Sequence, residues 1–425
     1  MKIPFKPSTV LIPKKDFEKW SVVACDQYTS DSDYWARVEK TVGDSNSTLR
    51  ITLPEIYLEE DNVSDRIDTI NQTMKKYIEG NVFNEISDSY IYTERSVSNG
   101  KIRKGLIGAF DLEAYNFNKG SDSQIRATEG TVLERIPPRV KIRENAPLEL
   151  PHIMILIDDR NNAVVESVLS AKNDENKLYE FDLMENGGHI SGYKVSGADA
   201  ENLNAALETL YDEKAFNEKY SVSDKPLLIF AVGDGNHSLA TAKTCWENLK
   251  KTLSPEEQLT HPARYALAEL VNVHDESLEF EPIHRLIFDV DTEKFEKELK
   301  MYFAECDIGE ASEMKENAFS VIIGENSKNY VLNKPKFNLT VGDVQSFIDY
   351  YVKNVESKCK VDYIHGEETV YNKAKEENTV GILLPSMAKN DLFRTVIVDG
   401  VLPRKTFSMG HANEKRFYLE CRKIK

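Results

Sequence analysis

Cysteine is scarce in this chain, and the few cysteines that occur exclude several classes of protein. Among 425 residues there are five, all widely separated, and none belongs to a C-x-x-C pair. An odd number of scattered cysteines is typical of reduced thiols, and not of a disulfide framework or a structural zinc site. The histidines show neither H-x-x-x-H nor H-E-x-x-H spacing, so a zinc hydrolase has little support.

Long apolar runs and an excess of positive charge are also missing. No stretch is long and apolar enough to span a bilayer, and residues 1–7 lack the apolar core of a signal peptide. With 54 basic and 71 acidic side chains, the net charge is −17, which disfavours nucleic acid and anionic membranes as partners. We therefore expect a cytoplasmic protein that binds a small-molecule substrate, in an oligomeric state that the sequence leaves open.

The most informative segment that is present runs from residue 225 to residue 243. Its apolar residues 227–232 predict a buried strand, and the apolar residues that follow at helical spacing predict an amphipathic helix. Gly233 and Gly235 lie between the two, where they permit a tight turn and a close approach of a ligand. Four polar residues gather at this turn: Asp234, Asn236, His237 and Ser238.

This turn is a candidate anion site. The first N–H groups of a helix lack backbone acceptors, and the helix dipole favours negative charge beside them. The alternative is structural: Asp234 or Asn236 caps the helix, and the glycines serve the turn. A cap needs one polar residue, whereas this turn carries four, including His237, so we favour a functional site.

A locally basic stretch and several isolated polar residues are further candidates. Residues 126–143 are rich in cations, although ion pairs within a solvated loop explain them equally well, and Pro137-Pro138 predict that the middle is extended. Asp26, Tyr28 and Thr29 follow a short apolar strand and are expected to face the pocket at the turn, whereas Cys25 beside them is expected to be a small buried thiol. For the adjacent His284 and Arg285 an exposed loop is the simpler interpretation. His152 stands apart from other candidate ligands in the sequence.

The predicted elements indicate an α/β protein with mixed sheets. Residues 89–93 and 104–110 are predicted strands joined as a hairpin, and residues 65–79 and 343–355 are predicted helices. Alternating strand and helix patterns over 361–384 predict a βαβ unit. We expect two domains, an N-terminal α/β domain over 1–250 that carries the turn and a C-terminal α/β domain over 251–425 packed against it.

Four short motifs resemble those of domain-of-unknown-function family 1015, in the family's order and over nearly the whole chain. Residues 234–238 are similar to its D-G-H-H-R turn and residues 128–131 to its H-E-x-T segment, with Arg139 where the family has a basic residue. Residues 282–285 are similar to P-x-H-R, and residues 403–406 to P-x-K-x-T. Asn236 and Ser238 depart from the family's histidine and arginine, and that arginine would be a phosphate ligand.

The turn also resembles that of the ParB/sulfiredoxin superfamily, which includes nucleotide-hydrolysing partition proteins, sulfiredoxin and a free-serine kinase. This resemblance implies a ParB/sulfiredoxin-like core and phosphate binding at the turn and the helix start. A redox activity like that of sulfiredoxin requires a cysteine beside the turn, and residues 236–238 contain none.

These observations lead to the hypothesis of a nucleotide- or phosphate-binding enzyme. It would be a phosphotransferase or nucleotide hydrolase that acts on a small hydroxyl metabolite and uses ATP, ADP or another nucleotide with Mg²⁺. The alternative is a non-catalytic sensor that binds a metabolite or nucleotide in the same pocket. The catalytic candidates are Asp234, His237 and Glu129, and metal ligands stay unknown. The candidate cofactor-binding residues are Gly233, Gly235, Asn236, Ser238, Arg126, Thr128, Arg139, His284 and Arg285.

Overall fold

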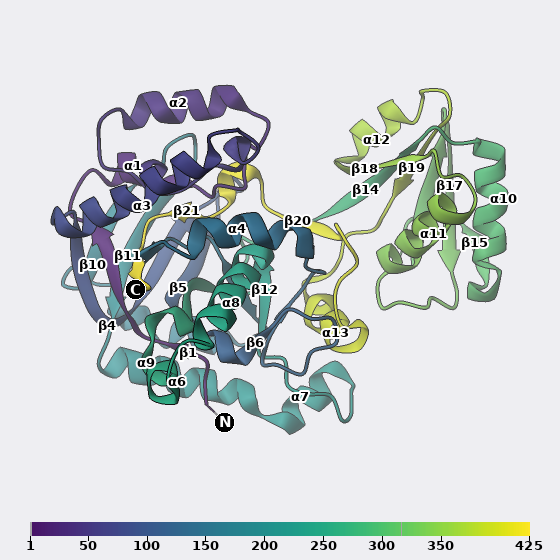
Figure 1. Cartoon of the computed structure of the whole chain (residues 1–425). Coiled ribbons are helices and arrows are strands. Elements are labelled where there is room, and N and C mark those ends of the chain that lie inside the picture. Colours follow the sequence, from purple (N-terminus) through teal and green to yellow (C-terminus); the bar gives the residue numbers. More distant parts are fainter. Residues whose placement is uncertain (1, 316) are drawn as a thin grey trace. The chain divides into compact units, whose positions relative to one another are not determined.

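The computed structural model describes residues 2–315 and 317–425 and divides into two compact units of mixed α/β structure (Figure 1). The first unit runs to Leu278 and resumes at His411–Lys425, and the second is Glu279–Gly410. The predicted α/β class is confirmed. The units differ from the predicted domains 1–250 and 251–425, because β13 (Tyr265–Asn272) pairs with β5 (Ile102–Asp111) inside the first unit.

The first unit is built on one large mixed sheet of order β10-β11-β4-β5-β13-β9-β12-β7-β6. The strands predicted at 89–93 and 104–110 lie within β4 and β5, which pair as an antiparallel hairpin. Two short strands, β1 (Phe5–Lys6) and β2 (Ser8–Pro13), add to β5 and β4. The remaining strands are β4 (Phe83–Ser96), β6 (Tyr115–Asn116), β7 (Ile125–Ala127), β9 (Met154–Ile157), β10 (Lys177–Asp182), β11 (His189–Val195) and β12 (Phe230–Asp234).

Helices cover both faces of this sheet. Successive side chains of a strand point to opposite sides, so apolar residues of the same strand pack against helices on either face. Tyr90 and Tyr92 share a core with α6 (Ala198–Glu208) and α8 (Asn236–Lys250). The intervening Ile91 belongs to the opposite core, with α2 (Ser32–Val42) and α3 (Val63–Glu79). The helix predicted at 65–79 is thus confirmed. Shorter helices complete the unit: α1 (Phe17–Trp20), α4 (Ile136–Arg143), α5 (Ala163–Glu166), α7 (Glu213–Tyr220) and α9 (Pro255–Thr260).

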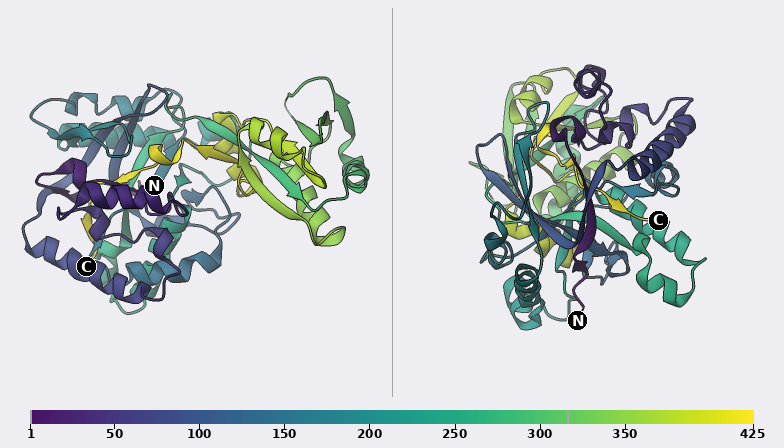
Figure 2. Two further views of the ribbon diagram at one scale, coloured as in Figure 1. Left: turned by 90° about the horizontal axis from the view of Figure 1, so that it is seen from above. Right: turned by 90° about the vertical axis from the view of Figure 1, so that its left-hand side faces the viewer.

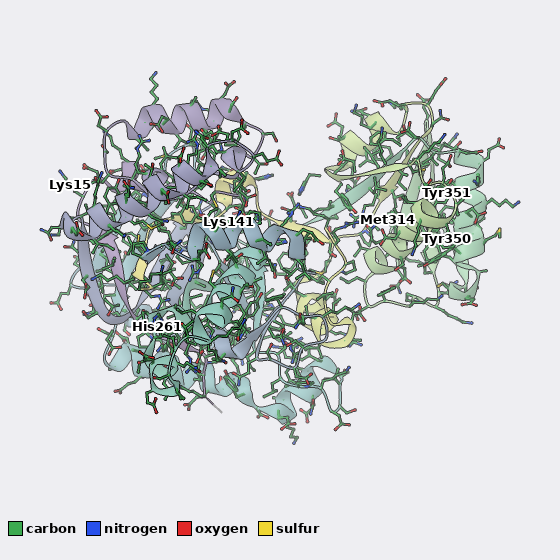
Figure 3. All side chains as sticks on the ribbon, in the orientation of Figure 1. Lys15, Lys141, His261, Met314, Tyr350 and Tyr351 are labelled. Atoms are coloured by element: carbon green, nitrogen blue, oxygen red, sulfur yellow. The ribbon has the colours of Figure 1, made fainter. Side chains whose placement is uncertain are left out.

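Helix α4 corrects one prediction. Pro137 and Pro138 were expected to keep this segment extended, yet they occupy the first turn of a helix. Proline is tolerated there, because the first N–H groups of a helix have no helical acceptor and its fixed φ suits the helix. Lys141 on this helix is exposed (Figure 3). Within the described residues, no helix combines the length and apolarity of a membrane span.

The C-terminal tail, His411–Lys425, belongs to the first unit and pairs with two of its strands. Its strand β21 (Phe417–Tyr418) pairs with β3 (Val22–Val23), and β22 (Arg422–Lys423) pairs with β8 (Leu148–Glu149). Figure 2 shows the yellow tail beside the purple N-terminal segment. The Arg95 guanidinium donates to the carbonyls of Asn413 and Lys415 at 2.6 and 2.7 Å. Buried polar contacts therefore fix the course of the tail.

The second unit has a sheet of order β15-β17-β16-β19-β14-β18. Helices α10 (Thr292–Tyr302) and α11 (Thr340–Asn354) share one core with the sheet, and α12 (Glu367–Lys373) shares another. The helix predicted at 343–355 is confirmed; on α11, Tyr351 is buried and Tyr350 is exposed (Figure 3). The other elements are β14 (Phe280–Phe288), β15 (Ile308–Ala311), β16 (Ala318–Ile323), β17 (Asn326–Leu332), β18 (Lys360–His365), β19 (Thr379–Leu383), α13 (Lys389–Asp399) and β20 (Phe407–Met409).

Candidate functional site

The predicted turn joins β12 to α8. Gly235 is the N-cap of α8 with a φ of 76°, and no side chain caps the helix. A Cβ at Gly235 would lie 3.0 Å from the Cα of Ile153, so both the backbone angle and the contact require glycine. Asp234 accepts a hydrogen bond from the Gly235 N–H at 3.0 Å. Neither Asp234 nor Asn236 is the cap. Gly235 is the cap residue, so no side chain occupies the first N–H groups of the helix.

A lysine from the tail supplies positive charge at this turn. The Lys415 ammonium lies 3.1 Å from the Asp234 carboxylate, and both side chains are largely covered. Beside them, the Asn236 side-chain oxygen is buried and has no hydrogen-bond partner among the described residues. An unpaired buried acceptor is unfavourable, so the turn offers a place for a donor from outside.

His152 is the centre of a hydrogen-bonded cluster at the helix start. Its Nε2 lies 3.1 Å from Ser238 Oγ and 3.4 Å from the Asp26 carboxylate, and its Nδ1 lies 2.9 Å from the Tyr418 hydroxyl. The Cys25 N–H donates to the same hydroxyl at 3.2 Å. The expectation that Asp26 faces the pocket at the turn is confirmed. His152 was wrongly set apart, because the contact arises from the antiparallel pairing of β9 with β12.

The charges of this cluster are strongly coupled. Burial opposes protonation of His152, but the nearby Asp26 outweighs it and raises the pKa of the imidazole above its ordinary value. Burial likewise opposes ionisation of Asp26, but His152, with Gln27, outweighs it and lowers the pKa of the carboxyl. An imidazolium–carboxylate pair is therefore favoured towards neutral pH. Burial raises the pKa of the Cys25 thiol to about 12, which leaves no reactive thiolate.

Cys25, His152, Ser238 and Tyr418 of this cluster line a cavity of about 150 Å³. The salt bridge between Arg139 and Glu55 also lines this cavity. A cavity of this size holds a ligand about as large as benzene, so a whole nucleotide cannot fit inside. The rest of the lining is mainly aliphatic, with Ile51, Leu53, Leu58, Met74, Ile142 and Leu148.

The other predicted residues of the first unit divide into two groups. Thr128 donates to the Val232 carbonyl at 2.6 Å, and His237 Nε2 accepts from the Val132 N–H at 3.3 Å, so both lie at the turn. Glu129 follows Thr128 and is half-buried. The buried Arg126, in contrast, donates to carbonyls of the backbone, at Ser123, Pro226 and Leu227.

His284 and Arg285 belong to the second unit, and both are buried on β14. The expectation of an exposed loop is therefore wrong, because these polar residues lie within a sheet strand. His284 Nδ1 accepts from the Leu384 N–H at 3.2 Å. Over residues 2–315 and 317–425, no group of three or more His, Cys, Asp or Glu side chains is arranged to hold a metal ion.

Several solved structures are similar to this chain. A free serine kinase mutant in complex with AMP is 13% identical with a TM-score of 0.39, over 75% of this chain and 90% of that chain. A conserved hypothetical protein from Pyrococcus furiosus is 12% identical with a TM-score of 0.36, over 75% and 94%. SbnI with a C-terminal truncation, from Staphylococcus aureus, is 10% identical with a TM-score of 0.29, over 62% and 82%. No curated protein matches the chain.

The family comparison covers most of the chain. Residues 4–351 match the family described as "Protein of unknown function (DUF1015)". This range includes the turn at 234–238 and the motif at 282–285. Membership assigns no activity, so the site is interpreted from its own geometry. The chain belongs to the protein family of unknown function DUF1015.

Proposed function

We propose that this protein transfers a phosphoryl group from a nucleotide to the hydroxyl group of a small metabolite. The observation that carries the proposal is the pair of His152 and Asp26 beside Ser238 at the N-terminus of α8, where His152 and Ser238 line a cavity of about 150 Å³. A base, a small acceptor pocket and a helix start that favours anions then adjoin one another.

The phosphates of the nucleotide would bind at the turn. The N–H groups at the start of α8 and the Lys415 ammonium supply hydrogen-bond donors and positive charge there. Phosphoryl transfer depends chiefly on positioning and on neutralising charge, which such a site supports. Mg²⁺ carried by the nucleotide would add charge neutralisation, and Asp234 is the carboxylate at the turn that would hold it.

The acceptor would occupy the cavity, since a nucleotide is too large for about 150 Å³. Its hydroxyl oxygen forms a bond to the phosphorus, and the bond from phosphorus to the leaving oxygen of the nucleotide breaks. The hydroxyl proton passes to the His152 imidazole in its neutral form, so turnover should rise as the pH passes above the raised pKa of this histidine. His237 and Glu129 are assigned to positioning at the turn, and Arg139 to the wall of the acceptor pocket.

A non-catalytic sensor is the second candidate. Two observations favour it: Asp234 is already paired with Lys415 and Glu55 with Arg139, and Ser238 stands where the family has arginine. Such a protein would bind nucleotide and metabolite at the same site without forming product.

The test measures ADP formation from ATP and Mg²⁺ with a panel of small hydroxyl compounds, beside calorimetric binding of the same nucleotide. We expect His152→Asn and Asp26→Asn to lower turnover by about 10²–10⁴-fold while nucleotide binding persists. His189→Asn is the matched control, because His189 is an exposed histidine paired with Asp182. Binding without product in the wild type favours the sensor, and absence of both contradicts both candidates.

A further inference from the structure

A second cluster of cationic side chains lies wholly within the second unit. Arg285 on β14 is fully buried, and Arg404, just before β20, is exposed. Their guanidinium carbons lie 4.7 and 5.5 Å from the centroid of the Tyr363 ring. Arg285 also donates to the Arg404 carbonyl at 3.0 Å. The two motifs at 282–285 and 403–406, far apart in the sequence, therefore meet at one place.

The buried guanidinium has no anionic partner. Arg285 donates to the Gln345 side chain at 2.9 Å and to two carbonyls. Among the described residues, no carboxylate lies within ion-pair distance of Arg285 or Arg404, and the nearby Asp349 accepts from Gln345 at 2.9 Å. Buried charges are normally paired, because removing an unpaired ion from water costs roughly several kcal/mol. Burial lowers the pKa of Arg285 to about 10, so it stays charged at neutral pH.

Two further basic residues adjoin this pair. β18 pairs with β14 so that Arg285 opposes Tyr363 and Ile283 opposes His365, which places these side chains on one face of the sheet. His365 is exposed at the end of β18. Lys405 is exposed and adopts a left-handed backbone with a φ of 54°. A lysine in this conformation carries backbone strain of about 1 kcal/mol or more. Strained backbone conformations of this kind are found most often at ligand-binding and active sites.

The loop that presents these cations is held in place by the backbone and by Thr406. The Thr406 hydroxyl donates to the Pro403 carbonyl at 2.6 Å, which closes the loop on itself. β20 then pairs with the first residues of β14, with Pro282 opposite Phe407. Arg404 and Lys405 are thus fixed beside Arg285 by contacts that do not involve their own side-chain charges.

We propose that Arg404, Lys405 and His365 form a binding site for a phosphate group, as in a phosphate monoester, above the fixed positive charge of Arg285. A dianion suits this site because Arg285 and Arg404 lie at the same ring and neither forms an ion pair among the described residues, and the Arg404 guanidinium can form two parallel hydrogen bonds to phosphate oxygens. The site lies within residues 279–410 and is independent of the function proposed for the cavity.

The test follows the imidazole signals of His365 by NMR in the whole protein, labelled at its eight histidines, during titration with inorganic phosphate. A His365→Gln variant assigns the signal, and chloride of equal ionic strength controls for screening. We expect saturable movement of the His365 signals. The double variant Arg404→Gln/Lys405→Gln should weaken the fitted affinity by about 10-fold or more, because charged hydrogen bonds are lost.

Lys375→Gln is the matched control, since Lys375 is an exposed lysine of the same unit outside the cluster. It should bind phosphate as the wild type does. His152→Asn should also leave the His365 response unchanged, which separates this site from the cavity of the first unit. The proposal is overturned if His365 does not respond to phosphate, if the response survives in the double variant, or if His152→Asn abolishes it.

Discussion

At the scale of single residues, the pair of Asp26 and His152 is the most consequential contact. Since Asp26 raises the pKa of His152, the imidazole should lose its proton above the ordinary value of 6.5. The Asp26→Asn variant should lower that pKa, because burial then acts without the opposing carboxylate. NMR titration of the His152 ring measures both values without requiring activity. The same midpoint in both proteins would refute this coupling.

Gly235 allows a second test at this scale. Gly235→Ala combines a positive φ with a Cβ 3.0 Å from a backbone atom of Ile153, and we expect a loss of stability of about 1–3 kcal/mol. Gly120→Ala is the control, because Gly120 also has a positive φ but no atom would lie within 4 Å of its Cβ. Denaturant unfolding of both variants isolates the contact. Equal losses would mean that the approach of Ile153 is relieved by a shift.

Asp158 links charge to stability. Burial opposes its ionisation, but hydrogen bonds from His274, Lys219 and Tyr220 outweigh it and hold its pKa at about 2, against an ordinary 3.8. A depressed carboxyl pKa stabilises the fold above pH 3.8, and this contribution disappears as the pH falls through 2. Asp158→Asn should therefore cost about 2 kcal/mol at neutral pH, and the difference from wild type should shrink towards pH 2. Unfolding curves across this pH range check the convergence.

At the scale of elements, local patterns were predictable and distant contacts were not. The segment from β12 through α8 follows from apolar spacing and two glycines, which are properties of adjacent residues. The contacts of His152 with Ser238 and Tyr418 join residues 86 and 266 positions apart, so no local pattern announces them. The helix at Pro137 was misjudged because the first turn of a helix and an extended loop tolerate proline equally well.

The contribution of the C-terminal tail to stability can be tested at Arg416. Arg416 is buried, and its guanidinium lies 2.8 Å from the Glu269 carboxylate on β13. Arg416→Met removes the cation and leaves both Glu269 and Glu420 buried without this partner, which should cost about 3–5 kcal/mol. The double variant Arg416→Met/Glu269→Gln should recover part of this loss. Hydrogen exchange should show the loss at β21, β3 and β13, and no rescue in the double variant would contradict a pairwise role.

At the scale of the whole molecule, the two units have separate cores, so damage to one should stay within it. Phe347 on α11 is buried in the second unit's core. We expect Phe347→Ala to destabilise that unit by about 3–5 kcal/mol and to speed amide exchange in β14, β16 and β19. Exchange in β5 and β13 of the first unit should not change, because their apolar contacts belong to other cores. Equal acceleration in both units would show that the chain unfolds as one cooperative body and that the contact division does not describe its energetics.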